Sequence, residues 1–354
     1  MTWLIVLNSL LFVVTLSEYL ICIKYVSNTY EYKNEWFNIL LCLVFTPFYS
    51  CVFIRKFSWN KIKMYMAPER RHVITYPILT GVLYTAETFL IFFALNTVTL
   101  SYYTILRSGF IIFNIPWFKY LLKKPVSRLY YASCASLVVS HVLSASQYIV
   151  HERERDPGQG QDPGQDRDRD QVRDVIQNTI IITISCFLNS SYNNIIEYSM
   201  KRYGEIMPNI DFQIIFQSTY FVLAAPLSIY YTTKHIPPIN PTTMTMYFFI
   251  AVGLQIYMYN KIYILNSKQS MIPANILLSG LDLLRRVIQL TYSFVWFKEP
   301  FDATIGVSLV FLGISGGLLL YQYIRDYRLG TNTRSHQQMV DSVNEGDDRE
   351  LENV

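Results

Sequence analysis

The segment from Met271 to Phe297 reads MIPANILLSGLDLLRRVIQLTYSFVWF and is apolar over a membrane-spanning length, except for Asp282, Arg285 and Arg286. Each ionisable group in such a helix costs about 2.5 to 3.5 kcal/mol to insert, so the three require partners or a water-filled cavity. The carboxylate lies three residues before one arginine and four before the other, so it can pair with either on one helix face. We expect the second arginine to lack a partner in its own helix and to bind an anionic ligand. The alternative is a purely structural ion pair between helices.

The composition is that of a polytopic membrane protein. Of the 354 residues, 51% are hydrophobic and only 16% are charged, against roughly 25% charged in an ordinary soluble domain. We expect the boundary between the third and fourth apolar runs near Thr97 to Leu100. The ten predicted spans are 3–26, 36–54, 72–96, 99–122, 129–149, 177–200, 211–232, 243–265, 271–297 and 303–324.

Lysines and arginines gather after the even-numbered spans, which predicts that these loops and both termini are cytosolic. Lys298 and the arginine-containing segment 151–174 would then face the other side. The supporting clusters are Arg55, Lys56, Lys61, Lys63, Arg70, Arg71, Lys123, Lys124, Arg128, Lys201, Arg202, Arg325 and Arg328.

The segment 151–174 divides the chain nearly in half. It contains the repeat DPGQGQDPGQ followed by alternating Asp and Arg, and it has almost no apolar residue to pack, so we expect a disordered linker. The predicted units are a five-helix repeat over 1–150, this linker, a second five-helix repeat over 175–326 and an acidic disordered tail over 327–354.

The two halves resemble each other at their fourth spans. A helix containing Arg107 ends in WFKYLLKKP (117–125), and a helix containing Arg285 ends in FVWFKEP (294–300). Two repeats with an odd number of spans insert in opposite orientations, which is the inverted-repeat plan of many secondary transporters. The sequence therefore predicts an all-α membrane protein with ten transmembrane helices.

These residues carry a resemblance to the drug/metabolite transporter superfamily, and within it to the solute carrier 35 clan of nucleotide-sugar transporters. It is strongest over LYTAETFLIFFALNTVTLSYYTILRSGFIIF (83–113) and over 277–321, and NNIIEYSMKRYG (193–204) is similar to another clan segment. The LR in both halves and LDLLR resemble the branch that contains member F6 and the chloroquine-resistance transporter. The pair Arg285 and Arg286 is similar to the Lys-Arg pair with which triose-phosphate transporters hold phosphate.

The resemblance implies alternating access on a polar, anionic metabolite, with a nucleotide sugar or a related phosphorylated compound as the leading expectation. It also implies an endomembrane location such as the Golgi, endoplasmic reticulum, lysosome or vacuole. The runner-up is a proton-coupled exporter of amino acids, peptides or cationic compounds from an acidic organelle. A rival of another class is a non-transporting scaffold or receptor that signals through its acidic tail.

Two sets of polar residues inside the spans are candidates for the site. We interpret the first set as substrate-binding: Arg285, Arg286, Arg107, Lys24, Tyr102, Tyr103, Asn193 and Asn194. The second set would couple protons or form ion pairs: Asp282, Glu87, Glu18 and Glu197.

Several of these candidates have a structural alternative. Lys24 can extend its amine to the lipid headgroups. Glu87 is either a proton-coupling group or the partner of Arg107. Glu197 is interpreted as half of a surface ion pair with Lys201 at the membrane edge. The amides on the sixth span can bind a sugar or base, or can hold helices together, and the tyrosines, Tyr84 among them, can stack on a ligand ring or serve as packing.

No catalytic motif, metal cluster or cofactor-binding motif is present, so we expect no enzyme activity, no cofactor and no nucleic-acid partner. The expected partners are the lipid bilayer and a small-molecule substrate. Gly313 and Gly317 form a GxxxG pattern in the last span, along with Gly306 and Gly316, which predicts close helix packing inside the protomer and is also compatible with a homodimer.

Overall fold

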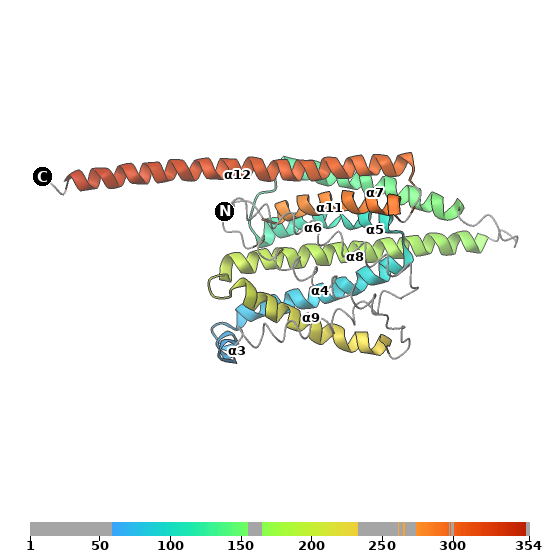
Figure 1. The fold of residues 1–354 in the computed structure, drawn as a ribbon, viewed down its shortest axis with the longest axis horizontal. Helices are drawn as coiled ribbons and strands as arrows, with labels where there is room; N and C mark the ends of the chain where they lie inside the picture. Colours follow the sequence, from blue (N-terminus) through green and yellow to red (C-terminus); the bar gives the residue numbers. More distant parts are fainter. Residues whose placement is uncertain are drawn as a thin grey trace.

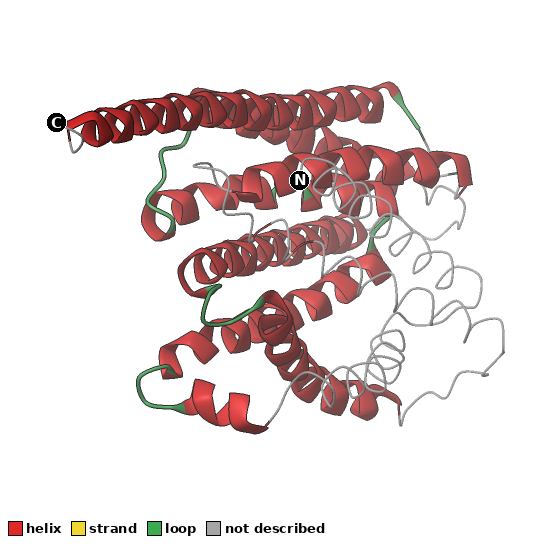
Figure 2. Ribbon diagram, turned by 60° about the vertical axis from the view of Figure 1, so that its left-hand side comes forward, coloured by secondary structure: helices red, strands yellow, loops and turns green. Residues whose placement is uncertain are grey.

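The computed structural model describes residues 59–154, 165–232, 261, 265, 274–296, 298 and 301–351. Every regular element in these residues is a helix, and none is a strand (Figure 2). The predicted spans 3–26 and 36–54, with Glu18 and Lys24, lie outside the described residues, as does most of the span 243–265.

The helices follow the apolar runs of the sequence. Three of them are long and apolar enough to cross a membrane, over Arg71–Ile91, Arg128–Gln147 and Ala303–Asp326. The elements are α3 (Trp59–Met66), α4 (Arg71–Thr97), α5 (Leu100–Arg107), α6 (Phe110–Pro116), the π-helix η1 (Trp117–Leu121), α7 (Arg128–Glu154), α8 (Gln165–Tyr203), α9 (Asn209–Thr232), α11 (Ala274–Trp296) and α12 (Ala303–Leu351).

The helices form a bundle whose long members lie roughly along one direction (Figure 1). α8 runs through the middle of the bundle and packs against α4 on one side and α6 on the other. α4 also contacts α9, while α12 packs against both α7 and α11. α8 therefore stands between α4 and the helices that carry the arginines.

The boundary predicted between the third and fourth spans is confirmed, because α4 ends at Thr97 and α5 begins at Leu100. The predicted span 99–122, however, is not one regular helix. It breaks at Ser108 and Gly109, and it ends in a π-helical turn after Pro116, which lacks an N–H for the helical ladder. A Cβ on Gly109 would lie 2.9 Å from the ring carbon Cε1 of His141, so glycine permits the close approach of α7 at the break.

Two segments predicted to be disordered are partly helical. α8 begins at Gln165, inside the predicted linker, and α12 continues through the predicted tail to Leu351. Both segments extend a helix that the neighbouring apolar run has already formed. Adding residues to an existing helix avoids the cost of nucleation, so polar sequence can continue it.

The close helix packing predicted for the glycines of the last span occurs at Gly316 on α12. The contact between α11 and α12 uses Gly280 and Gly316, where an added Cβ would meet Leu320 at 2.8 Å and Leu283 at 3.1 Å. At Gly313 and Gly317, no atom of another described helix lies within 4 Å of an added Cβ. The spacing of two glycines does not say which face of the helix meets a neighbour.

Gly81 brings α4 and α9 together, because a Cβ there would lie 2.7 Å from the Phe216 carbonyl oxygen and 2.7 Å from the Thr219 Cβ. We expect Gly81→Ala to push the helices apart and to lower the free energy of unfolding by about 1 to 3 kcal/mol. Gly313→Ala is the matched control and should leave the melting temperature unchanged or raised. Equal melting curves for the two purified variants would contradict the packing of α4 on α9.

Candidate functional site

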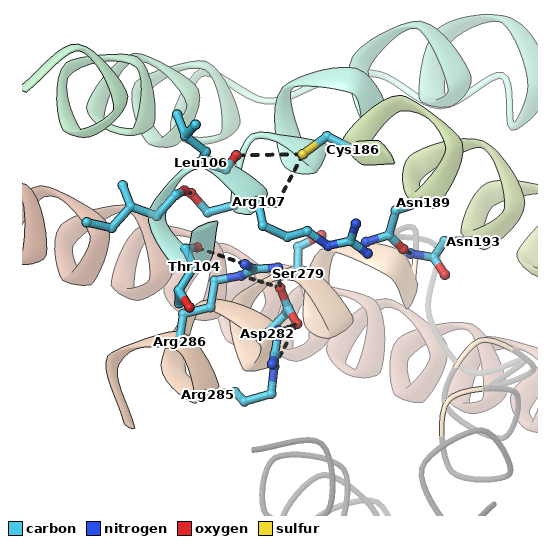
Figure 3. Close-up of polar contacts among 12 residues, drawn as sticks. Thr104, Leu106, Arg107, Cys186, Asn189, Asn193, Ser279, Asp282, Arg285 and Arg286 are labelled. Atoms are coloured by element: carbon cyan, nitrogen blue, oxygen red, sulfur yellow. Dashed lines mark hydrogen bonds and ion pairs between the residues drawn. The ribbon is translucent and has the colours of Figure 1, made fainter. Parts of the chain in front are cut away.

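Asp282 binds both neighbouring arginines of α11 (Figure 3). Its Oδ1 accepts hydrogen bonds from Nε and Nη2 of Arg285 at 2.9 and 2.6 Å, and its Oδ2 accepts one from Nε of Arg286 at 2.7 Å. All three side chains are buried. The expectation that one arginine lacks a partner in its own helix was therefore wrong, because each carboxylate oxygen binds one guanidinium.

The two arginines nevertheless differ in what else they contact. Arg286 donates a second hydrogen bond from Nη1 to the carbonyl oxygen of Thr104 on α5, at 2.8 Å. Among the described residues, the buried Nη1 of Arg285 has no hydrogen-bond partner. Arg286 thus ties α11 to α5, whereas Arg285 has one buried donor that no described residue bonds.

The carbonyls around the break between α5 and α6 are bound by side chains from other helices. Next to the Thr104 carbonyl, Ile105 O lies 2.9 Å from Nε2 of His141 on α7. Sγ of Cys186 on α8 lies 3.3 Å from Arg107 O. The free carbonyl groups at a helix end need hydrogen-bond partners when that end is buried in a bundle. These side chains supply such partners at the break between α5 and α6.

Arg107 and Glu87 form the ion pair that the sequence offered as one of two readings. Nη2 of Arg107 binds Oε1 of Glu87 on α4, and Nη1 donates to Oγ of Ser185 on α8 at 2.9 Å. Both members are buried, at 7% and 1% exposure. The pair therefore links three helices, and it shows that Glu87 has a cationic partner.

Lys261 belongs to the same region, and sequence reasoning missed it. Its Nζ donates to the hydroxyl of Tyr192 at 2.8 Å and lies 4.3 Å from the centroid of that ring. The side chain is 1% exposed and interacts electrostatically with Glu87, Asp282 and both Arg107 and Arg285. A lone lysine inside the apolar run 243–265 was the signal that could have found it.

These residues form one group, which we call the charge cluster: Glu87, Arg107, Lys261, Asp282, Arg285 and Arg286. Four members are cationic and two are acidic, so the cluster is positive when all six are ionised. α4, α5 and α11 each contribute to it, and α8 lines it through Ser185 and Tyr192. A buried region with this balance favours an anion.

The amides of α8 mainly hold helices together. Oδ1 of Asn114 on α6 accepts hydrogen bonds from Ser190 Oγ at 2.7 Å, Asn194 Nδ2 at 2.9 Å and Asn275 Nδ2 at 3.1 Å. Asn193 donates within α8 to Asn189 Oδ1 at 2.9 Å. Of the two readings, the structure supports the contact between helices for Asn194, which joins α6 to α8.

Glu197 forms the predicted ion pair with Lys201, but it is not at the surface, so that part of the prediction was wrong. It is 0% exposed and accepts the backbone N–H groups of Ala274 at 2.9 Å and Asn275 at 3.0 Å, while it also pairs with Lys201. A carboxylate at this place satisfies the free N–H groups at the start of α11 and complements the helix dipole. Beside it, partial burial and the charge of Lys201 lower the pKa of Lys124 to about 8.

The tyrosine candidates divide into two groups. Tyr103 interacts electrostatically with Arg107 and Arg286, and Tyr84 with Glu87 and Arg107, so both border the charge cluster. The Tyr84 ring also packs edge-on against Tyr192, with centroids 5.6 Å apart. Tyr102 instead shares a 2.8 Å hydrogen bond with Thr179 Oγ1 on α8.

Comparison with known proteins supports the fold and adds no named function. No family model matches the chain, and no curated protein matches it. Among solved structures, the chain is similar to one described as "Crystal structure of protein", with a TM-score of 0.55 over 91% of this chain and 97% of that one. Their sequences are 11% identical, so the likeness concerns the backbone architecture alone.

Proposed function

We propose that the chain is a multi-pass secondary transporter that moves a polar, anionic metabolite by alternating access. The leading substrate class is a nucleotide sugar or a related phosphorylated compound. The proposed architecture is ten transmembrane helices in two inverted five-helix repeats, in an endomembrane and with cytosolic termini. Three described helices long enough to span a bilayer support the membrane part of this proposal.

The observation that carries the proposal is the unused donor of Arg285 in a cluster with more cations than carboxylates. Burying an ionised group without compensation is costly, and buried polar atoms in native proteins are nearly always bonded. Nη1 of Arg285 has no partner, although the rest of its guanidinium is held rigidly by Asp282. An anionic substrate would satisfy this donor and reduce the excess positive charge.

The position of the cluster supports the mechanism as well. Arg107 comes from the first proposed repeat and Arg285 from the second, and both interact electrostatically with Lys261. When the two halves move relative to each other, the arrangement of these cations around a bound ligand changes. Alternating access requires such a site, because a ligand shifts the equilibrium between two orientations only when it contacts them differently.

Arg285→Lys tests the anion site. Lysine keeps the charge but loses the planar guanidinium, so we expect substrate affinity to fall roughly ten- to a hundredfold, which corresponds to about 1.5 to 3 kcal/mol. The substrate is first identified by screening nucleotides, nucleotide sugars and sugar phosphates for a rise in melting temperature. Uptake is then measured in proteoliposomes loaded with counter-substrate.

Two further lysine variants serve as controls. Arg286→Lys removes the bond to the Thr104 carbonyl, so it should lower the melting temperature as well as transport. Arg325→Lys changes an exposed pair with Asp326 and should do neither. If Arg285→Lys transports like the unmodified protein, the arginine pair is architectural and the anion-carrier proposal is wrong.

The runner-up function, a proton-coupled exporter, depends on Glu87, which is a buried carboxyl. Because Glu87 is paired with Arg107, we expect Glu87→Gln to lower the free energy of unfolding by about 3 to 5 kcal/mol. The dependence of the transport rate on pH should keep its shape. Asp326→Asn, in the exposed pair, should cost less than about 1 kcal/mol. A flattened pH profile with unchanged stability would favour the exporter instead.

A further inference from the structure

One face of α11 carries polar residues three and four positions apart, from Ser279 through Asp282, Arg286 and Gln289 to Ser293. All five are buried. This face points away from α12, which contacts the side of α11 that carries Gly280 and Leu283. It is therefore the side of the helix that holds the charge cluster.

Gln289 on this face is unusual because neither end of its amide is bonded within the described part of the chain. The side chain is 0% exposed, yet no described residue forms a hydrogen bond with its Oε1 or Nε2. Leaving one buried amide unsatisfied costs about 1 to 3 kcal/mol in proteins, and an apolar residue of the same size would avoid the cost. Because Gln289 destabilises the ligand-free protein in this way, we infer that its amide binds a group from outside the chain.

The neighbours of Gln289 have unused groups of the same kind. Arg285, with its partnerless Nη1, lies four residues earlier and hence one turn away on a neighbouring part of the face. On α5, Oγ1 of Thr104 is also buried without a partner among the described residues, and Arg286 binds the carbonyl of that residue. Buried unbonded atoms occur on other helices too, but these belong to α5 and α11, which Arg286 joins.

We propose that Gln289 is a specificity-determining residue that binds a hydroxyl-bearing part of the ligand whose anionic group Arg285 holds. The inference rests on the proposed function. An amide both donates and accepts, as a hydroxyl group does, whereas a guanidinium only donates and so binds the anion. The four-residue spacing places the two ligand groups about 6 Å apart. The ligand class is then a phosphate ester with hydroxyl groups, such as a polyol or sugar phosphate, in preference to inorganic phosphate or an alkyl phosphate.

The test compares two phosphate monoesters of equal charge, glycerol 3-phosphate and propyl phosphate, on the full chain in detergent. Affinities come from the dependence of the melting temperature on ligand concentration, with inorganic phosphate as the charge-only reference. The unmodified protein should bind glycerol 3-phosphate about tenfold more tightly than propyl phosphate, as expected for one or two additional hydrogen bonds. Gln289→Met, of similar length but apolar, should bind both esters equally.

The same variant gives a readout that needs no ligand. Removing an unsatisfied buried amide should raise the melting temperature of the ligand-free protein, and Gln289→Leu provides a second apolar replacement. Gln322→Met is the matched control, because Gln322 is buried on α12. It should leave the preference between the two esters unchanged.

The outcomes separate this inference from the function on which it rests. If Gln289→Met lowers the melting temperature and keeps the preference for glycerol 3-phosphate, Gln289 is structural and the inference is wrong. If the unmodified protein binds both esters equally, the proposed anion site is retained but the proposed role of Gln289 is wrong. If neither ester nor inorganic phosphate binds, this inference is wrong, whereas the anion-carrier proposal is decided by Arg285→Lys with the substrate that the screen identifies.

Discussion

The structure depends on one constraint, the neutralisation of ionised groups inside an apolar bundle. Asp282 pairs with two guanidiniums through its two oxygens, and Glu87 pairs with a third. Removing either carboxylate would leave a buried cation, at a cost comparable to much of the stability of a domain. The positions of α4, α5 and α11 relative to α8 are therefore fixed by charge pairing and hydrogen bonds as well as by apolar packing.

Adjacent residues on a helix point about 100° apart, and this angle separates the roles of the two arginines. Arg286 reaches across to the backbone of α5 at the point where that helix ends. Arg285 shares the same carboxylate but has a donor left over. A pair that looks redundant in the sequence thus combines one arginine that joins two helices with one that has a buried donor unbonded by any described residue.

Sequence reasoning succeeded where the information lies within one helix. The spacing from Asp282 to its arginines predicted one of the two ion pairs, and the weakly polar junction at 97–100 predicted the end of α4. It failed where the partner is on another helix. Glu197 has Lys201 at an ideal spacing, yet its main task is to bind the start of α11, 77 residues away along the chain.

The same reason explains the residues that were missed or misjudged. Lys261 is the one charged residue of its apolar run, but its partners, and those that Gln289 lacks among the described residues, follow only from the three-dimensional surroundings. The glycines of the last span predicted a contact without specifying a face, and the neighbouring helix approaches Gly316. Periodicity gives the face of a helix that is buried, but the pairing of faces is a property of the assembled bundle.

The oxygen of Asn114 that receives three donors from α8 and α11 has a consequence for rates. Those contacts are lost together when α6 moves away, because one acceptor then loses all three donors. Asn194 keeps its bond to the Ser190 carbonyl at 2.8 Å, whereas each group left without a partner costs about 1 to 3 kcal/mol until water replaces that partner. Separation at this end of the bundle therefore meets an activation barrier.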